Sequence, residues 1–304
     1  MLDALIDAFQ RGDRRALSRL LSLAARGDLG ESFLEKLKPP SQPSRVVALT
    51  GAAGVGKSTL AGRIIEYLRK QNQKVGVLAS DPQSPLTGGA LLGDRFRMPS
   101  GPDEGIFIRS LAAASGQGAI AKNLQTMIGT LESFGFSNIL VETVGAGQGD
   151  TAVRDVADVV VLLLQPESGD EIQGEKAGLL EVADIIAIHK ADLPGVEKAE
   201  TELRHGLEVA MHRNVPILRV SGKTGAGIEQ LWKAISERPL RRSGPRRDAR
   251  ALLRLAQESL ASRFHQGKSD PAFVRILDEW TVGKASTEEA LARLWSILEL
   301  DKKK

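Results

Sequence analysis

The sequence predicts an α/β protein in which helices cover both faces of a mainly parallel β-sheet. Short runs rich in apolar and β-branched residues recur through the middle of the chain: RVVALT, KVGVLAS, SNILVET, VVVLLLQ, DIIAIHK and VPILRVS. Stretches with helical spacing separate these runs. In a helix over residues 118–135, for example, one face would carry Ile120, Leu124, Met127, Leu131 and Phe134. Nearly continuous apolar strands that alternate with helices are typical of a parallel sheet buried on both sides.

The chain divides into three predicted parts. Residues 1–44 form a helical N-terminal extension, which ends in the breaker segment PPSQPS. Residues 45–239 contain the alternating strands and helices, and residues 240–304 return to helical spacing with apolar stripes that include Trp280 and Trp295. Because large aromatic side chains are costly to expose, we expect this last part to be a dimerisation arm. Packing of the stripes onto the chain's own sheet domain is the alternative.

Composition and charge exclude several classes of protein. The longest apolar runs, such as VVVLLL, are far shorter than the ~20 residues that span a bilayer. The chain has no cysteine, which excludes a disulfide framework and fits a reducing compartment. A net charge of +3 is too weak to indicate a nucleic-acid partner, and the first residues mix acids and bases unlike a signal peptide. We therefore expect a cytoplasmic protein with no membrane and no nucleic-acid partner.

The segment RPLRRSGPRRDAR, residues 238–250, contains six arginines. A solvated linker is the interpretation that we favour, since charge runs usually lie in solvent and the overall charge is modest. A contact with an anionic partner is the alternative.

A glycine-rich loop follows the first predicted strand. It reads GAAGVGKST and matches the pattern G-x-x-x-x-G-K-[ST] from Gly51 to Ser58. Glycines allow the backbone to wrap a polyphosphate, and the following helix directs its N-terminus at the anion. Lys57 can reach the β- and γ-phosphates, and Ser58 can offer a hydroxyl to Mg²⁺. An ordinary strand-to-helix turn is the alternative, but the full spacing favours nucleotide binding, without distinguishing ATP from GTP.

Three carboxylates follow predicted strands, where a Mg²⁺-nucleotide site would need them. Asp81 ends the strand in VLASDPQS, and Asp94 lies in the glycine-rich stretch LLGDRFRM after it. Glu142 ends the strand in NILVETVG, with Gly145 at the third position after it, a spacing common in P-loop proteins. Each could instead be an ordinary loop carboxylate or a helix cap.

The stretch IIAIHKAD bears on the identity of the base. It resembles the N-K-x-D element of GTPases, with His189 in place of asparagine. Asp192 could accept hydrogen bonds from guanine N1–H and N2–H₂, which adenine does not offer, and the stem of Lys190 could lie over the ring. An asparagine would normally bridge the base and the phosphate loop. We expect that the imidazole can donate one hydrogen bond there but cannot copy the donor–acceptor pair of the amide with the same geometry. The next predicted strand ends in VSGKTGAG. Its residues Ser221, Gly222 and Lys223 lie where GTPases place a short loop under the base.

Together these stretches resemble the ArgK/MeaB family of GTPases, which are chaperones of adenosylcobalamin-dependent acyl-CoA mutases. The similarity runs from about residue 46 to residue 192. It includes GAAGVGKSTL, DPQSPLTGGALLGDRFRM, FIRSLAAASGQGAIAK, ILVETVGAGQGDTAV, GDEIQGEKAGLLEVADI and HKAD. The departures are Ala53, where the family often has proline, and His189.

The resemblance implies binding of GTP or GDP with Mg²⁺ and assigns roles by position. The implied Mg²⁺ ligands are Ser58, Asp81, Asp94 and Glu142. The implied phosphate contacts are Lys57 and the backbone of residues 54–59, which comprises Gly54, Val55, Gly56, Lys57, Ser58 and Thr59. Residues 82–98 would be switch I, residues 145–155 switch II, and residues 165–176 a third switch that reports the nucleotide state to the mutase. The candidates to orient water or add charge in hydrolysis are Arg97, Gln148 and Lys176, beside Lys57 and Asp94.

Three functions are compatible with these residues. The first is a homodimeric GTPase with a low intrinsic rate, which gates adenosylcobalamin delivery to a mutase and protects or reactivates it. The second is a GTPase that delivers a metal, which the absence of cysteine and the scattered histidines disfavour. The third is an ATP-dependent kinase or transport accessory, against which Asp192 argues.

Overall fold

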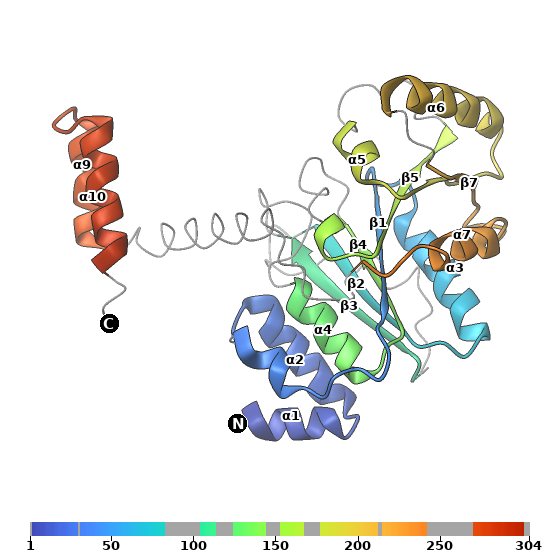
Figure 1. The fold of residues 1–304 in the computed structure, drawn as a ribbon, viewed down its shortest axis with the longest axis horizontal. Helices are drawn as coiled ribbons and strands as arrows, with labels where there is room; N and C mark the ends of the chain where they lie inside the picture. Colours follow the sequence, from blue (N-terminus) through green and yellow to red (C-terminus); the bar gives the residue numbers. More distant parts are fainter. Residues whose placement is uncertain are drawn as a thin grey trace. The chain divides into compact units, whose positions relative to one another are not determined.

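The computed structural model describes residues 2–29, 31–82, 104–113, 124–143, 153–166, 177–211, 215–241 and 270–300. The chain falls into two compact units, residues 1–244 and residues 245–304, here called the first unit and the C-terminal unit (Figure 1). No helix in the described part of the chain combines the length and the apolar character that a membrane crossing requires.

The first unit contains one sheet, which has seven strands within the described ranges. These are β1 (Arg45–Gly51), β2 (Val75–Pro82), β3 (Ile106–Ala113), β4 (Asn138–Glu142), β5 (Val159–Leu164), β6 (Ile185–Ile188) and β7 (Ile217–Arg219). The strand order is β3-β2-β4-β1-β5-β6-β7, and all neighbouring strands are parallel. The predicted fold class is therefore confirmed.

Among the strands in the described ranges, β3 is the one that the sequence pattern did not predict. Within those ranges it lies at the edge of the sheet and pairs only with β2. An edge strand is less enclosed than a central one, and Arg109 and Ser110 interrupt the apolar run of β3. By contrast, every residue of β4, β5 and β6 is buried, which is why their apolar runs were easy to recognise.

Helices cover both faces of the sheet in the first unit (Figure 1). The helices of this unit are α1 (Leu2–Gln10), α2 (Arg14–Arg26), α3 (Lys57–Lys70), α4 (Leu124–Phe134), α5 (Ala177–Val182), α6 (Val196–Met211) and α7 (Ile228–Ser236), with a 3₁₀ turn at Glu31–Lys36. Alternate residues of β1 enter different cores, because successive side chains of a strand point to opposite faces. Val46 and Ala48 pack with α1, α2 and α4, whereas Val47 and Leu49 pack with α3 and α7.

The N-terminal helices are part of the core of the first unit. Leu17, Leu20 and Leu21 of α2 are fully buried in the cluster that includes the sheet and α4. Helix α2 begins at an N-cap, Asp13, whose carboxylate accepts a hydrogen bond from Arg15 N at 2.7 Å, and it ends at Gly27 in the left-handed conformation. The helical spacing predicted for this region is confirmed.

The C-terminal unit contains a helical hairpin of α9 (Pro271–Thr281) and α10 (Thr287–Leu300). Its small core consists of Phe273, Ile276, Ala290 and Leu294. Trp280 and Trp295 remain 49% and 43% exposed. The hairpin therefore presents apolar surface that its own two helices do not bury.

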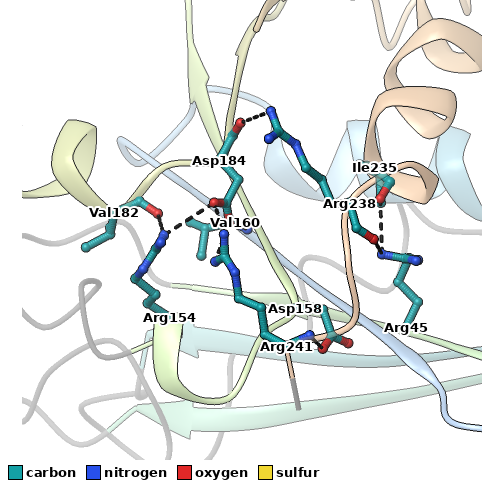
Figure 2. Close-up of polar contacts among 9 residues, drawn as sticks. All are labelled: Arg45, Arg154, Asp158, Val160, Val182, Asp184, Ile235, Arg238 and Arg241. Atoms are coloured by element: carbon teal, nitrogen blue, oxygen red, sulfur yellow. Dashed lines mark hydrogen bonds and ion pairs between the residues drawn. The ribbon is translucent and has the colours of Figure 1, made fainter. Parts of the chain in front are cut away.

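The start of the arginine-rich segment is bound to the first unit (Figure 2). The guanidinium of Arg241 forms a two-pronged ion pair with the buried carboxylate of Asp184, and Arg238 donates to the carbonyl oxygen of Asp184 at 3.1 Å. The backbone N–H of Arg241 donates to Asp158 at 2.8 Å. The interpretation of a solvated linker is thus wrong for both arginines, because the carboxylates of Asp158 and Asp184 fix Arg241 and the carbonyl oxygen of Asp184 binds Arg238. Residues 242–250 lie outside the described ranges.

Candidate nucleotide-binding site

The glycine-rich loop lies at the carboxyl edge of the sheet, between β1 and α3. Ligands of open α/β sheets bind at this edge, where strand ends and helix N-termini meet. Gly51, Gly54 and Gly56 have φ values of 143°, 76° and 101°, which L side chains rarely adopt. A Cβ at Gly51 would also lie 2.4 Å from the carbonyl oxygen of Leu163 in β5. The glycines thus let the loop lie directly on the neighbouring strand.

Lys57 is the first residue of α3 and is buried at 6% exposure. Its Nζ donates to the carbonyl oxygens of Gly51 and Ala52 at 3.0 Å and 3.1 Å, so the side chain folds back over the loop. A cation in this position lies within the loop that would surround a polyphosphate, next to the positive end of the helix dipole. The arrangement provides strong local attraction for an anion.

Ser58 and Glu142 offer oxygen ligands suited to a divalent cation. The hydroxyl of Ser58 donates to Oε1 of Glu142 at 2.7 Å, and both side chains are buried. Mg²⁺ is held in nucleotide sites by such hydroxyl and carboxylate oxygens, so the pair fits this ion. Asp81 is the last residue but one of β2 and lies two residues beyond Ala79, the register partner of Glu142, but its side chain lies outside the described residues. When bound, Mg²⁺ would neutralise charge on the phosphates.

His189 joins the phosphate loop to the loop beneath the candidate base site. Its Nδ1 lies 2.8 Å from the carbonyl oxygen of Val55, and its Nε2 accepts a hydrogen bond from the N–H of Gly222 at 3.1 Å. The acceptor role of Nε2 puts the proton on Nδ1, which then donates to Val55. The imidazole therefore bridges the two protein loops, rather than the phosphate loop and the base as an asparagine amide would. Both ring nitrogens are occupied by the protein, so neither can contact a base.

Two glycines make room for the imidazole. A Cβ at Gly56 would lie 2.4 Å from Cε1 of His189, and a Cβ at Gly222 would lie 2.8 Å from Nε2. Side chains at these positions would force the ring to move. The close fit, with His189 only 4% exposed, explains why a histidine can replace the smaller asparagine here.

Asp192 is an exposed carboxylate with a fixed orientation. The hydroxyl of Ser221 donates to its Oδ1 at 2.6 Å, and the N–H of Thr224 donates to the same hydroxyl oxygen at 3.2 Å. The hydrogen bond from Ser221 holds the pKa of Asp192 below its ordinary value of 3.8, so the side chain is an anion with acceptor capacity directed to solvent. A carboxylate of this kind offers the acceptors that N1–H and N2–H₂ of guanine would need.

Lys190 and Lys223 complete the candidate base site. Lys190 has a φ of 58°, and its Nζ donates to Oε1 of Gln165 at 2.9 Å. This contact fixes the end of the Lys190 side chain, whose stem could lie along a base. Lys223 is exposed in the loop that follows Ser221.

The structure brings together the described members of the predicted set. Near one edge of the sheet lie Gly54, Val55, Gly56, Lys57, Ser58, Thr59, Glu142, His189, Lys190, Asp192, Ser221, Gly222 and Lys223. Outside the described residues lie Asp94, Arg97, Gln148 and Lys176. Three residues at the site were not predicted from the sequence: Gln165, Thr224 and Arg63. Of these, Arg63 contacts the loop at Gly222. Gln165 lies in the predicted third switch and Thr224 in the stretch VSGKTGAG, both without an assigned role at the base, whereas Arg63 belongs to no short motif.

The burial of the imidazole predicts a pH dependence of nucleotide binding. Desolvation lowers the pKa of His189 from its ordinary value of 6.5, more than the hydrogen bond to Val55 raises it. Protonation would put a second N–H of the ring against the N–H of Gly222. Neutral His189 therefore stabilises the contact between the two loops fully above pH 6.5. This stabilisation is lost as the pH falls from 6.5 through the lowered pKa of the imidazole. We expect GDP affinity, measured by calorimetry at several pH values, to fall over the same range.

His189→Asn is the matched control for this prediction. An asparagine amide can replace both loop contacts and has a second N–H for the base, a gain of about 1 kcal/mol. The variant should bind GDP several-fold more tightly at pH 7.5, bind ADP almost unchanged and lose the acid sensitivity. Equal binding of GDP and ADP by the unmodified protein would contradict the assignment of the base site.

A phosphate loop at the end of β1, a buried serine–glutamate pair and an oriented aspartate beyond β6 are the parts that define a P-loop GTPase. The profile of one family, described as methylmalonyl-CoA mutase-associated GTPase MeaB, matches residues 17–268. The chain belongs to this family.

Similar proteins agree with this assignment. A GTPase of Pyrococcus abyssi is 40% identical over 301 residues, which are 95% of this chain and 93% of that protein. The methylmalonic aciduria type A homolog of Mus musculus, a mitochondrial protein, is 36% identical over 199 residues, covering 63% of this chain and 48% of the mouse protein. A crystal structure of a LAO/AO transport system kinase matches with a TM-score of 0.66 at 24% identity, covering 98% of this chain and 97% of that chain, which supports the fold class alone.

Proposed function

We propose that this GTPase is a chaperone of an adenosylcobalamin-dependent acyl-CoA mutase, which gates cofactor loading and protects or reactivates the enzyme. The observation that carries the proposal is the match to the mutase-associated family over residues 17–268. The name of the mouse relative, which refers to methylmalonic aciduria, points to the same chemistry. In this proposal adenosylcobalamin is cargo, and the protein works in the cytoplasm.

The proposed nucleotide contacts follow from the arrangement of the carboxyl edge. Lys57 and the backbone of residues 54–59 hold the phosphates, while Asp192 accepts from guanine and the stem of Lys190 lies on the ring. For Mg²⁺ the proposed ligands are Ser58 and Glu142, with Asp81 and Asp94. The short distance between Ser58 Oγ and Glu142 Oε1 supports the first two.

Hydrolysis needs a placed water molecule and positive charge on the developing anion. Lys57 supplies charge from within the phosphate loop. Gln148, Arg97 and Lys176 are the proposed residues that orient water or add charge, each from a predicted switch segment. Contact with the mutase is proposed to fix these side chains in their catalytic positions. A tenfold gain in rate requires only about 1.4 kcal/mol of barrier lowering.

The test is GTP hydrolysis by the purified protein with and without methylmalonyl-CoA mutase, together with recovery of an inactivated mutase. We expect slow hydrolysis alone, at least tenfold stimulation by the mutase, and GTP-dependent recovery. Lys176→Ala should reduce the stimulated rate far more than the basal rate. The matched control is Lys198→Ala on α6, because that side chain is 83% exposed and pairs only loosely with Glu202.

Three outcomes would contradict the proposal. A basal rate equal to the rate with saturating mutase would show that hydrolysis serves another purpose. Purification with a stoichiometric transition metal would favour metal delivery, and preference for ATP would favour a kinase or transport accessory.

We also propose a homodimer that is built partly by the C-terminal unit. The exposed indoles of Trp280 and Trp295 support it, since burying such side chains against a second copy is favourable. Truncation after residue 245 should convert a dimer into a monomer in light scattering. A full-length protein that is monomeric at micromolar concentration, with and without nucleotide, would contradict the proposal.

A further inference from the structure

Arg63 connects the helix after the phosphate loop to the loop beneath the candidate base site. It lies on α3, six residues after Lys57. Its Nε donates to the carbonyl oxygen of Gly222 at 2.6 Å, and its Nη2 donates to the carbonyl oxygen of Lys223 at 2.8 Å. The remaining terminal nitrogen, Nη1, pairs with Glu66 one turn further along α3 at 2.9 Å. The planar guanidinium thus donates hydrogen bonds to two successive carbonyl groups of one loop. A lysine could not replace it, because its ammonium group lacks this forked geometry.

The same loop is also held by His189. The imidazole accepts from the N–H of Gly222, while Arg63 binds the carbonyl oxygen of that residue. A Cβ at Gly222 would lie 2.7 Å from Cγ2 of Thr59, so the backbone also packs closely against α3. The polar groups of the Gly222 backbone are thereby fixed from two elements of the fold, α3 and the end of β6.

The fixed loop in turn orients Asp192. Ser221 precedes the two carbonyl groups that Arg63 binds, and its hydroxyl holds the carboxylate of Asp192 at 2.6 Å. Thr224, which follows them, donates to the same hydroxyl oxygen. Movement of residues 222 and 223 would therefore displace their neighbours Ser221 and Thr224. These two residues position the hydrogen bond between Ser221 and Asp192. Asp192 is exposed, so solvent would not restrain it once that bond is lost.

We propose that Arg63 is a positioning residue for base discrimination, which acts through the loop 221–224 to hold Asp192 in the orientation that accepts from guanine. The proposal rests on the assignment of Asp192 to the guanine edge and is independent of the mutase role. Charge-assisted hydrogen bonds from a rigid helix suit this task, because they fix a loop before the nucleotide arrives. No step of hydrolysis involves Arg63 itself.

The test compares GDP with inosine diphosphate, which lacks the 2-amino group of guanine. Calorimetry should be done on the full chain with four variants: Arg63→Ala, Arg63→Lys, Asp192→Ala and the double variant Arg63→Ala/Asp192→Ala. We expect Arg63→Ala to raise the Kd for GDP about tenfold and to lower the preference for GDP over inosine diphosphate at least threefold. Arg63→Lys should fall between this variant and the wild type. In the Asp192→Ala background, removal of Arg63 should not change the preference further.

Glu66→Ala is the matched control, because it removes the surface partner of Arg63 and leaves both bonds to the loop carbonyls. It should keep the wild-type affinity and preference. The proposal is overturned if Arg63→Ala weakens GDP and inosine diphosphate equally, or if its preference stays within twofold of the wild type. Should Arg63→Ala fail to fold, as judged by circular dichroism, Arg63→Lys decides, and the proposal is overturned if that variant weakens GDP and inosine diphosphate equally. An unchanged preference in Asp192→Ala alone would instead refute the base-site assignment.

Discussion

Replacing Asp184 by alanine should lower the free energy of unfolding of the first unit by about 3–5 kcal/mol. The carboxylate is 4% exposed and lies at the amino end of β6 (Figure 2). It pairs with Arg241, lies 3.4 Å from Arg154 and accepts from the N–H of Val160 at 2.9 Å. Its removal leaves a guanidinium and an N–H group in a largely desolvated place. The loss would be a large part of the ~5–15 kcal/mol that stabilises a typical domain.

Fluorescence can measure this loss in the first unit separately. Trp232 is buried in α7, whereas the other two tryptophans belong to the C-terminal unit. With Trp280→Phe and Trp295→Phe, urea titration followed by fluorescence reports the first unit alone. Asp28→Ala is the control, since Asp28 forms an exposed pair with Arg26 and should change stability by less than about 0.5 kcal/mol. Equal midpoints for Asp184→Ala and the control would show that the ion-pair cluster is not important for stability.

The fold was predictable where burial on both faces left an unbroken apolar signal. β5 reads VVVLLL and lies next to β1 in the middle of the sheet, so its sequence reports its environment directly. β3 was missed because polar residues, Arg109 and Ser110, interrupt its apolar run. The arginines at 238 and 241 were misjudged for another reason. Their partners, Asp158 and Asp184, are distant in sequence, and a charge run does not reveal which carboxylates it will meet.

The candidate site was predictable where a short motif encodes its own geometry. The loop at residues 51–58 needs its glycines because of positive φ angles and close contact with β5, and both constraints are local. The loop connections were not predictable in the same way. His189 bridges to Val55 across 134 positions of sequence, and Arg63 reaches Gly222 across 159. Such contacts depend on the strand order β1-β5-β6-β7, which the sequence pattern leaves open.

Replacing Glu142 by glutamine should reduce GTP hydrolysis about 100-fold or more, because loss of even an outer-shell partner of a metal ligand costs about 10–100-fold. Glu142 is 3% exposed at the end of β4 and accepts from the hydroxyl of Ser58. The amide oxygen of glutamine can still accept that hydrogen bond, so the loop geometry should survive. What is lost is the negative charge beside the candidate Mg²⁺ position, and with it the attraction for a divalent cation.

A binding measurement separates this effect from a general loss of activity. The wild type should bind GDP more tightly with Mg²⁺ than with EDTA, and Glu142→Gln should lose most of that difference. In EDTA the two proteins should bind GDP alike, because Lys57 and the backbone of the loop are unchanged. Glu229→Gln makes the same chemical change on the exposed face of α7 and should resemble the wild type throughout. The contrary outcome is that Glu142→Gln hydrolyses GTP within fivefold of the wild-type rate and keeps the Mg²⁺ effect on GDP binding. That result would contradict the assignment of Glu142 as a metal ligand and leave this role to Ser58 and the aspartates.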